Sequence, residues 1–231
     1  MAQRLSGLRQ AMADAALQAG RNPAELSILP VSKTFPVDDI RQAQALGLTR
    51  FGENRLQELR QKAEAMVEQA PDWVVIGHVQ TNKAKDVARW ATELQTLDRL
   101  DLADALERRL QAEGRSLDVL IQVKTAAEES KHGLMPEELD GFLRALASYG
   151  SLRVKGLMTV ATQTDDVAAV RACFARLRTL RDRGRESVGG HVELDRLSMG
   201  MSGDFALAIA EGATEVRIGS ALFGARPVKV S

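Results

Sequence analysis

The sequence lacks most features that would place it in a specialised class of protein. Its 231 residues include one cysteine, one tyrosine and 4% aromatic residues, and its 31 basic side chains equal its 31 acidic ones. A single cysteine, Cys173, excludes an internal disulfide and fits a reducing cytosol. Because it falls in a helical apolar stripe, we expect it in the core. The balanced charge argues against a general nucleic-acid or membrane-surface binder.

No long apolar run is present either. None approaches the roughly 18 residues that a membrane-spanning helix needs. Arg4, Arg9 and Asp14 interrupt the N-terminal segment, which excludes the apolar region of a secretory signal. This segment instead predicts an amphipathic first helix, whose apolar residues are Leu5, Leu8, Met12 and Ala16. We therefore expect a cytoplasmic protein.

What the sequence does have is a regular alternation of short apolar runs and helical patterns. The expected strands are 27–33, 49–53, 73–78, 93–97, 117–123, 152–158, 193–199 and 215–219. Expected helices include 136–148, 165–182 and 202–210, the last with Ser202 as its N-cap. This alternation predicts parallel strands joined by helices. A doubly wound sheet would also fit, but eight repeats without a linker favour a (β/α)₈ TIM barrel, one domain over 1–231 with an extra N-terminal helix.

Polar residues collect where these strands end. In parallel α/β folds, ligands bind at the carboxyl ends of the strands. Amines, amides, hydroxyls and glycines dominate this edge, and we expect no metal-ligand cluster there. The residues are Lys33, Asn54, His78, Asn82, Lys83, Lys124, Lys131, Met158, Thr159, Ser198, Gly200, Ser202, Arg217, Gly219 and Ser220.

The turns after the seventh and eighth strands indicate a phosphate site. Small residues there present backbone N–H groups, and the hydroxyls of Ser198 and Ser220 can add further donors. Glycine-plus-serine loops taken alone also fit ordinary tight turns. Their occurrence after both of the last two strands favours phosphate, which barrels often hold at this position.

Lys33 would lie next to this phosphate site, because strand one neighbours strand eight in a closed barrel. A partly desolvated lysine can attack a carbonyl and form a Schiff base, so Lys33 suits a phosphorylated aldehyde such as pyridoxal 5′-phosphate (PLP). Arg217 would then donate to the pyridine nitrogen and oppose its protonation. Two alternatives stay open: Lys33 extending into solvent, and Arg217 pairing with Glu215.

Several of these segments together resemble the pyridoxal phosphate homeostasis proteins, single-domain relatives of the alanine racemase N-terminal barrel. The segments are "PVSKTFP", "RFGENRLQE", "IGHVQTNK", "GLMTVAT" and "LSMGMSGDFALAIAEGATEVRIGSALFGAR". The resemblance implies a barrel that carries PLP on Lys33, with the phosphate held by Ser198, Gly219 and Ser220. It also implies that Arg217 faces the pyridine nitrogen, and that Asn54, His78, Met199 and Met201 lie near the cofactor.

The chain departs from the usual family pattern at a few positions. Phe35 stands where a lysine is common, Lys124–Thr125 where an Asn–Ile-type pair is usual, and Gly203 where an acid is frequent. The proposed Schiff base and phosphate ligands are intact. Inferences about regulation by rim lysines or a PLP transfer route are weakened, although Lys131 is retained.

The resemblance implies control of vitamin B6 balance without strong catalysis. A racemase needs an acid/base on each face of the cofactor, and the only tyrosine, Tyr149, falls at the end of the barrel away from the expected site. The alternative within PLP chemistry is a weak amino-acid racemase. Outside it are a phosphosugar-binding barrel and a regulatory interaction protein. Expected partners are PLP and apo-enzymes that receive it, and we expect a monomer or weak homodimer.

Overall fold

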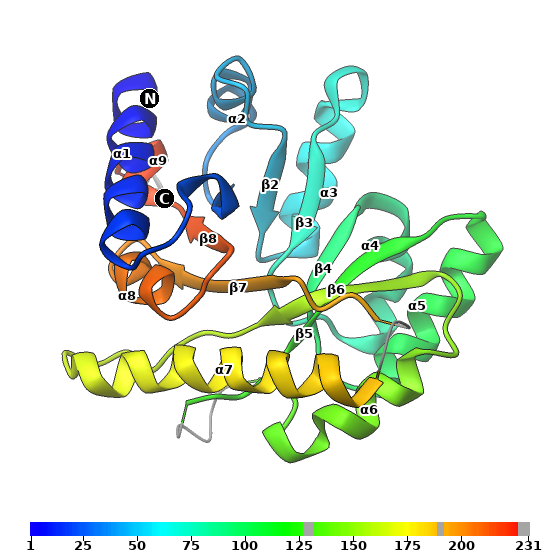
Figure 1. The fold of residues 1–231 in the computed structure, drawn as a ribbon. Helices are drawn as coiled ribbons and strands as arrows, with labels where there is room; N and C mark the ends of the chain where they lie inside the picture. Colours follow the sequence, from blue (N-terminus) through cyan, green and yellow to red (C-terminus); the bar gives the residue numbers. More distant parts are fainter. Residues whose placement is uncertain (127–131, 189–191, 226–231) are drawn as a thin grey trace.

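The eight strands form one closed parallel barrel with helices around it (Figure 1). The computed structural model describes residues 1–126, 132–188 and 192–225. Within the sheet the strand order is β1-β8-β7-β6-β5-β4-β3-β2. The strands are β1 (Ser27–Pro30), β2 (Arg50–Glu53), β3 (Asp72–Val75), β4 (Glu93–Leu97), β5 (Leu117–Gln122), β6 (Leu152–Met158), β7 (Arg196–Met201) and β8 (Glu215–Ile218).

The barrel closes between its first two strands, which lie at the two ends of that order. Val31 bridges Gly52 in parallel, and the Ser32 N–H donates to the Gly52 carbonyl at 3.0 Å. On the other side, β1 pairs with β8 so that Leu29 lies opposite Arg217. The prediction of a (β/α)₈ barrel is confirmed. Lys33 therefore leaves the strand next to the one that carries Arg217.

Helices follow the strands around the barrel. They are α1 (Ala2–Gln18), α2 (Val37–Gln44), α3 (Leu56–Ala65), α4 (Ala84–Trp90), α5 (Leu100–Glu113), α6 (Leu139–Leu146), α7 (Val167–Val188), α8 (Phe205–Ala210) and α9 (Ser220–Phe223). The predicted first helix is present, and α1 lies beside α8 and α9 (Figure 1). Arg4 fixes it there by donating to the Leu222 and Phe223 carbonyls at 2.7 and 3.0 Å.

Glycines end two of the helices, while the predicted serine N-cap is wrong. Gly47 and Gly212, at positive φ of 85° and 102°, follow α2 and α8. However, α8 begins at Phe205 and not near Ser202. The Asp204 carboxylate accepts from the Met201 N–H at 2.5 Å, so the chain turns once more before the helix starts.

The core and the surface agree with the composition. Cys173 is buried on α7, as its apolar neighbours predicted. Among the described residues, no helix is both long and apolar enough to cross a bilayer. Strands β4 and β5 are buried along almost their whole length, as expected for parallel strands covered on both sides.

Candidate functional site

The loop that carries Lys33 is fixed at the barrel rim by a buried ionic cluster. Lys33 itself is half-buried where the chain leaves β1. The preceding Ser32 donates its hydroxyl to Glu53 at 2.6 Å, and its carbonyl accepts from Lys62 at 2.8 Å. Lys62 also binds Glu53 and Glu58, both at 2.7 Å. Burial raises the pKa of Glu53, and the Lys62 ammonium opposes this shift.

Two further contacts hold the residues that follow Lys33. Thr34 has φ of 70°, a left-handed conformation that is uncommon outside glycine, and its N–H donates to Glu58 at 2.5 Å. Phe35 stacks on Phe223 of α9 with ring centroids 4.8 Å apart. Because α9 begins at Ser220, this stack ties the lysine loop to the turn after β8.

Arg217 is buried on β8 and points its guanidinium across the inside of the barrel. Its Nη1 donates to the Ser198 carbonyl at 2.8 Å and to the Ser198 hydroxyl at 3.0 Å, and its Nη2 donates to the Thr159 carbonyl at 2.8 Å. Burial lowers the pKa of Arg217 to about 10, with the charges of Glu215 and Asp204 opposing, so it remains a cation at neutral pH.

The pairing of Arg217 with Glu215, one of the two alternatives, is not observed. In the described part of the chain, no carboxylate forms an ion pair with Arg217, and its Nε–H has no acceptor. A buried cation without a counter-charge is costly unless something else uses it. The free Nε–H is the donor that a ligand at the mouth could use.

A chain of hydrogen bonds connects Arg217 to an ionic cluster deeper in the barrel. The Ser198 hydroxyl donates to Gln95 Oε1 at 2.7 Å. Gln95 Nε2 then donates to Glu93 at 2.7 Å and to Glu215 at 2.6 Å. Arg50 and Arg196 each bind both of these carboxylates, at distances of 2.6 to 3.0 Å. Glu215 is therefore neutralised by these two arginines, while Arg217 is oriented by neutral groups.

The two turns predicted to hold phosphate do present free donors. The backbone N–H groups and hydroxyls of Ser202 and Ser220 have no hydrogen-bond partner among residues 1–126, 132–188 and 192–225. The same is true of the Gly219 N–H. Ser198, in contrast, lies within β7 and is fully buried, as is its neighbour Met199. Ser198 thus contacts Arg217 directly, and its hydroxyl is already in use.

An open cavity of about 240 Å³ lies beside Arg217 at the ends of β3, β5 and β6. It is lined by Ile76, His78, Gln122, Val123, Lys124, Thr125, Ala126, His132, Met158, Thr159 and Val160. Thr159 connects it to Arg217, because the Thr159 carbonyl accepts from that guanidinium. Of the nine residues expected to hold the cofactor or lie near it, only His78 lines this cavity.

The remaining candidates are distributed around the rim. Asn54 is half-buried after β2 and lies in contact with Gly77, where an added Cβ would be 1.9 Å from the Asn54 carbonyl oxygen. Met201 is half-buried at the end of β7, while Asn82 and Lys83 are exposed. Lys131 lies outside the described residues.

Tyr149 lies at the other end of the barrel, as predicted. It precedes β6, and its hydroxyl donates to Asp104 at 2.6 Å. That hydrogen bond, together with burial, raises the pKa of Tyr149 to about 12. It is therefore protonated at neutral pH and distant from the strand ends where a ligand would bind.

Comparison with known proteins agrees with the barrel fold and shows the family. Residues 10–227 match the family model of the alanine racemase N-terminal domain. The pyridoxal phosphate homeostasis protein of Pseudomonas aeruginosa is 41% identical over 226 residues, covering 98% of this chain and 96% of its own length. The chain belongs to this family.

Two solved structures of PipY from Synechococcus elongatus superpose well on this chain. PipY of Synechococcus elongatus without PLP gives a TM-score of 0.87 at 34% identity, covering 97% of this chain and all of PipY. PipY with PLP bound gives a TM-score of 0.85 at 33% identity, covering 96% and 99% of the two chains.

Three features of the site were not predicted from the sequence. They are Gln95, the contact of the Thr159 carbonyl with Arg217, and the ion pair of Glu58 with Lys62. Only the ion pair has a spacing, i,i+4 on a helix, that the sequence could have indicated.

Proposed function

We propose that this chain is one barrel domain that binds pyridoxal 5′-phosphate reversibly, as a Schiff base on Lys33, and takes part in intracellular PLP homeostasis. The observation that carries the proposal is Arg217, a buried cation that has a free Nε–H and lies on the strand next to that of Lys33. Its family relatives are named for PLP homeostasis, and PipY has been solved with PLP bound.

The donor set fits the parts of PLP. The Lys33 amine would take the aldehyde, and Arg217 would donate to the pyridine nitrogen. A guanidinium that stays protonated opposes protonation of that nitrogen, which weakens the ring as an electron sink. Gly219 and Ser220 have free donors for the phosphate, and Ser202 offers the same groups from the neighbouring turn.

The other predicted cofactor residues have more indirect roles in this proposal. Ser198 would act by fixing Arg217, because its hydroxyl and carbonyl both accept from that guanidinium. Met199 would support the pocket from below, since it is fully buried. Asn54 and His78 would contact the ring from the ends of β2 and β3.

Trapping the adduct tests this proposal directly. PLP is added to the full chain, the product is reduced with borohydride, and the modified peptide is identified by mass spectrometry. We expect one equivalent of cofactor on Lys33. Modification mainly of Lys83, Lys124 or Lys131 would contradict the proposed attachment, and absence of any adduct would contradict PLP binding in this form.

We further propose that turnover is weak or absent. Proton transfer on both faces of a bound amino acid requires a second acid/base opposite Lys33. Tyr149 cannot supply it from the other end of the barrel. Amino-acid racemisation that depends on Lys33 and survives rigorous purification would instead favour the racemase alternative. Apo-enzymes remain the proposed recipients of the cofactor, and monomer or weak homodimer the proposed assembly.

A Ser198→Ala variant should bind PLP more weakly than the wild type. Removing the hydroxyl takes one of three hydrogen bonds from Arg217 and leaves the Gln95 amide oxygen without its donor. We expect a stability loss of about 1–2 kcal/mol and a several-fold weaker PLP affinity. Urea denaturation and PLP titration measure the two effects.

Ser151→Ala is the matched control for this variant. Ser151 is also buried and donates its hydroxyl to a charged group, Glu107, at 3.1 Å. It lies before β6, at the opposite end of the barrel. It should lose similar stability and keep its PLP affinity. Equal PLP affinities for the two variants would show that Ser198 has no role in positioning Arg217.

A further inference from the structure

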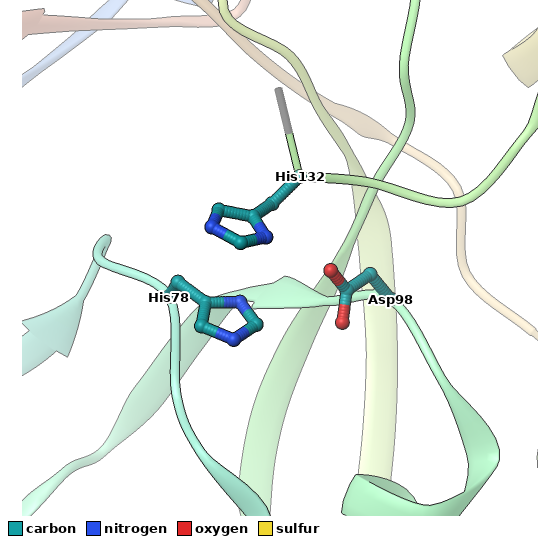
Figure 2. A group of neighbouring side chains, drawn as sticks. All are labelled: His78, Asp98 and His132. Atoms are coloured by element: carbon teal, nitrogen blue, oxygen red, sulfur yellow. The ribbon is translucent and has the colours of Figure 1, made fainter. Parts of the chain in front are cut away.

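A second cluster of side chains lies at the same end of the barrel and shares His78 with the proposed cofactor site. His78 follows β3, Asp98 follows β4, and His132 lies between β5 and α6. One potential ligand atom from each lies within 4.8 Å of the others. Figure 2 shows the two imidazoles one above the other with the carboxylate beside them. Their ring centroids are 3.8 Å apart and their planes differ by 13°.

The chemistry of these three groups is that of an open zinc site. Two imidazole nitrogens and one carboxylate form the protein ligand set of several zinc enzymes, with the fourth position left to water or substrate. Bonds of about 2.0–2.2 Å put tetrahedral ligand atoms roughly 3.3 Å apart. Because the ligand atoms already lie within 4.8 Å of one another, the distances alone require shifts of at most about 1 Å per side chain. Both imidazoles are exposed, so these shifts meet little packing.

Stacked rings cannot both direct a lone pair at one ion, because each lone pair lies in the plane of its own ring. Metal binding must therefore turn at least one imidazole about its side-chain bonds. We therefore expect that the stacked arrangement of His78 and His132 belongs to the metal-free protein, and that the rings no longer stack once the ion is bound.

The surroundings of the cluster favour ligation. His78 is exposed, but partial desolvation by its neighbours still lowers its pKa. The neighbouring His132 lowers it further against the opposing charge of Asp98, so the neutral ligand form prevails at pH 7. Arg99 binds Asp98 at 2.7 Å and donates to the Val79 carbonyl at 2.5 Å, which fixes the direction of that carboxylate. Such partners of ligand residues orient many metal sites.

We propose that His78, Asp98 and His132 bind a divalent transition-metal ion of the zinc type. Imidazole ligands select zinc, cobalt, nickel or copper over magnesium and calcium. Because His78 and His132 both line the 240 Å³ cavity, the fourth coordination position faces that cavity. A small ligand or water bound there would complete the coordination.

Zinc titration of the untagged full chain tests the proposal. The protein is treated with EDTA, freed of PLP, and titrated with zinc chloride in a calorimeter, so that the result does not depend on the proposed cofactor. We expect one equivalent bound with micromolar or tighter affinity. His78→Gln, His132→Gln and Asp98→Asn should each weaken binding by at least about 100-fold, more than the loss of a residue that only orients a ligand side chain costs.

The chain offers close controls for these variants. It has three histidines, and His191→Gln removes the one that is not among the proposed ligands. Asp101→Asn removes the other carboxylate that binds Arg99, at 3.0 Å from its Nε. Cys173→Ser removes the only thiol. All three should bind zinc as the wild type does. Absence of stoichiometric binding in the wild type, or equal loss in His191→Gln, would overturn the proposal.

A measurement on the wild type removes any dependence on the folding of variants. Two-bond ¹H–¹⁵N correlations report the state of each imidazole nitrogen. On addition of zinc, the signals of two of the three histidines should shift together and the third should not. Shifts of a single histidine, or of His191, would contradict the site.

Discussion

A Lys33→Ala variant should fail to acquire the absorbance band at about 420 nm that PLP gives when it forms a Schiff base with a lysine. The wild type should show this band on addition of PLP. Lys33 is half-buried, and contacts with Glu53, Glu58 and Lys62 fix the backbone on both sides of it at the barrel rim. Without the amine, only the contacts to phosphate and ring remain. We expect PLP affinity to fall at least about 100-fold, or roughly 2.7 kcal/mol.

Two controls separate covalent attachment from charge and from nonspecific reaction. Lys33→Arg keeps the cation but supplies no nucleophilic amine, so it should also lack the band. Lys83→Ala removes an exposed amine at the same end of the barrel and should keep both band and affinity. A Lys33→Ala protein with a full band, or a Lys83→Ala protein without one, would show that another amine carries the cofactor.

The fold could be predicted from the sequence because the alternation of strands and helices is periodic. The residues at which strands and helices begin and end were harder to predict. The predicted seventh strand covered residues 193–199, but β7 begins at Arg196 and runs to Met201, because Gly200 and Met201 continue the strand before the chain turns. The mistaken N-cap at Ser202 follows from the same extension. An Asp204 carboxylate that binds the backbone of Met201 has no sequence signature that distinguishes it from a cap.

Ligands bind at the carboxyl ends of parallel strands, and the candidate site residues that this rule covers could be predicted from the sequence. Lys33 and Ser220 follow from it. The rule says nothing about side chains that point into the barrel from mid-strand, so Gln95 and its bond to Ser198 were missed. It also missed the grouping of His78 with His132, which lie 54 residues apart in the numbering and meet only because β3 and β5 both flank β4.

The deeper ionic cluster gives the largest expected effect on stability. Glu215 is fully buried and Glu93 nearly so, and each is bound by Arg50 and Arg196. An Arg196→Met variant leaves two buried carboxylates with a single counter-charge. Breaking a buried pair in this way costs about 3–5 kcal/mol. We expect the free energy of unfolding, measured by urea denaturation at pH 7, to fall by about 3 kcal/mol. This is the low end of the range because the arginine side chains are partly exposed.

Arg153→Met is the control for loss of an arginine from a strand. Arg153 pairs with Asp118 at 2.6 Å, and its side chain is 53% exposed. An exposed pair of this kind contributes roughly 0–1 kcal/mol. If both variants lost the same stability, the buried cluster would contribute no more to stability than an exposed ion pair.

The pH dependence of the Arg196→Met deficit identifies its cause. Burial raises the pKa of Glu215, but the attraction of Arg196 and Arg50 and the hydrogen bond from Gln95 outweigh it, so the pKa lies below its ordinary value. A lowered pKa in the folded state means a stabilising contribution that is present above the ordinary glutamate pKa and lost as pH falls through the folded value. Without Arg196, the attraction that opposes the effect of burial is weaker, and the pKa of Glu215 rises. Protonation then relieves the uncompensated charge, and the deficit relative to wild type should shrink as pH is lowered from 7 toward about 4.5. A deficit that stays constant or grows over this range would show that lost packing, rather than an unpaired carboxylate, destabilises the variant.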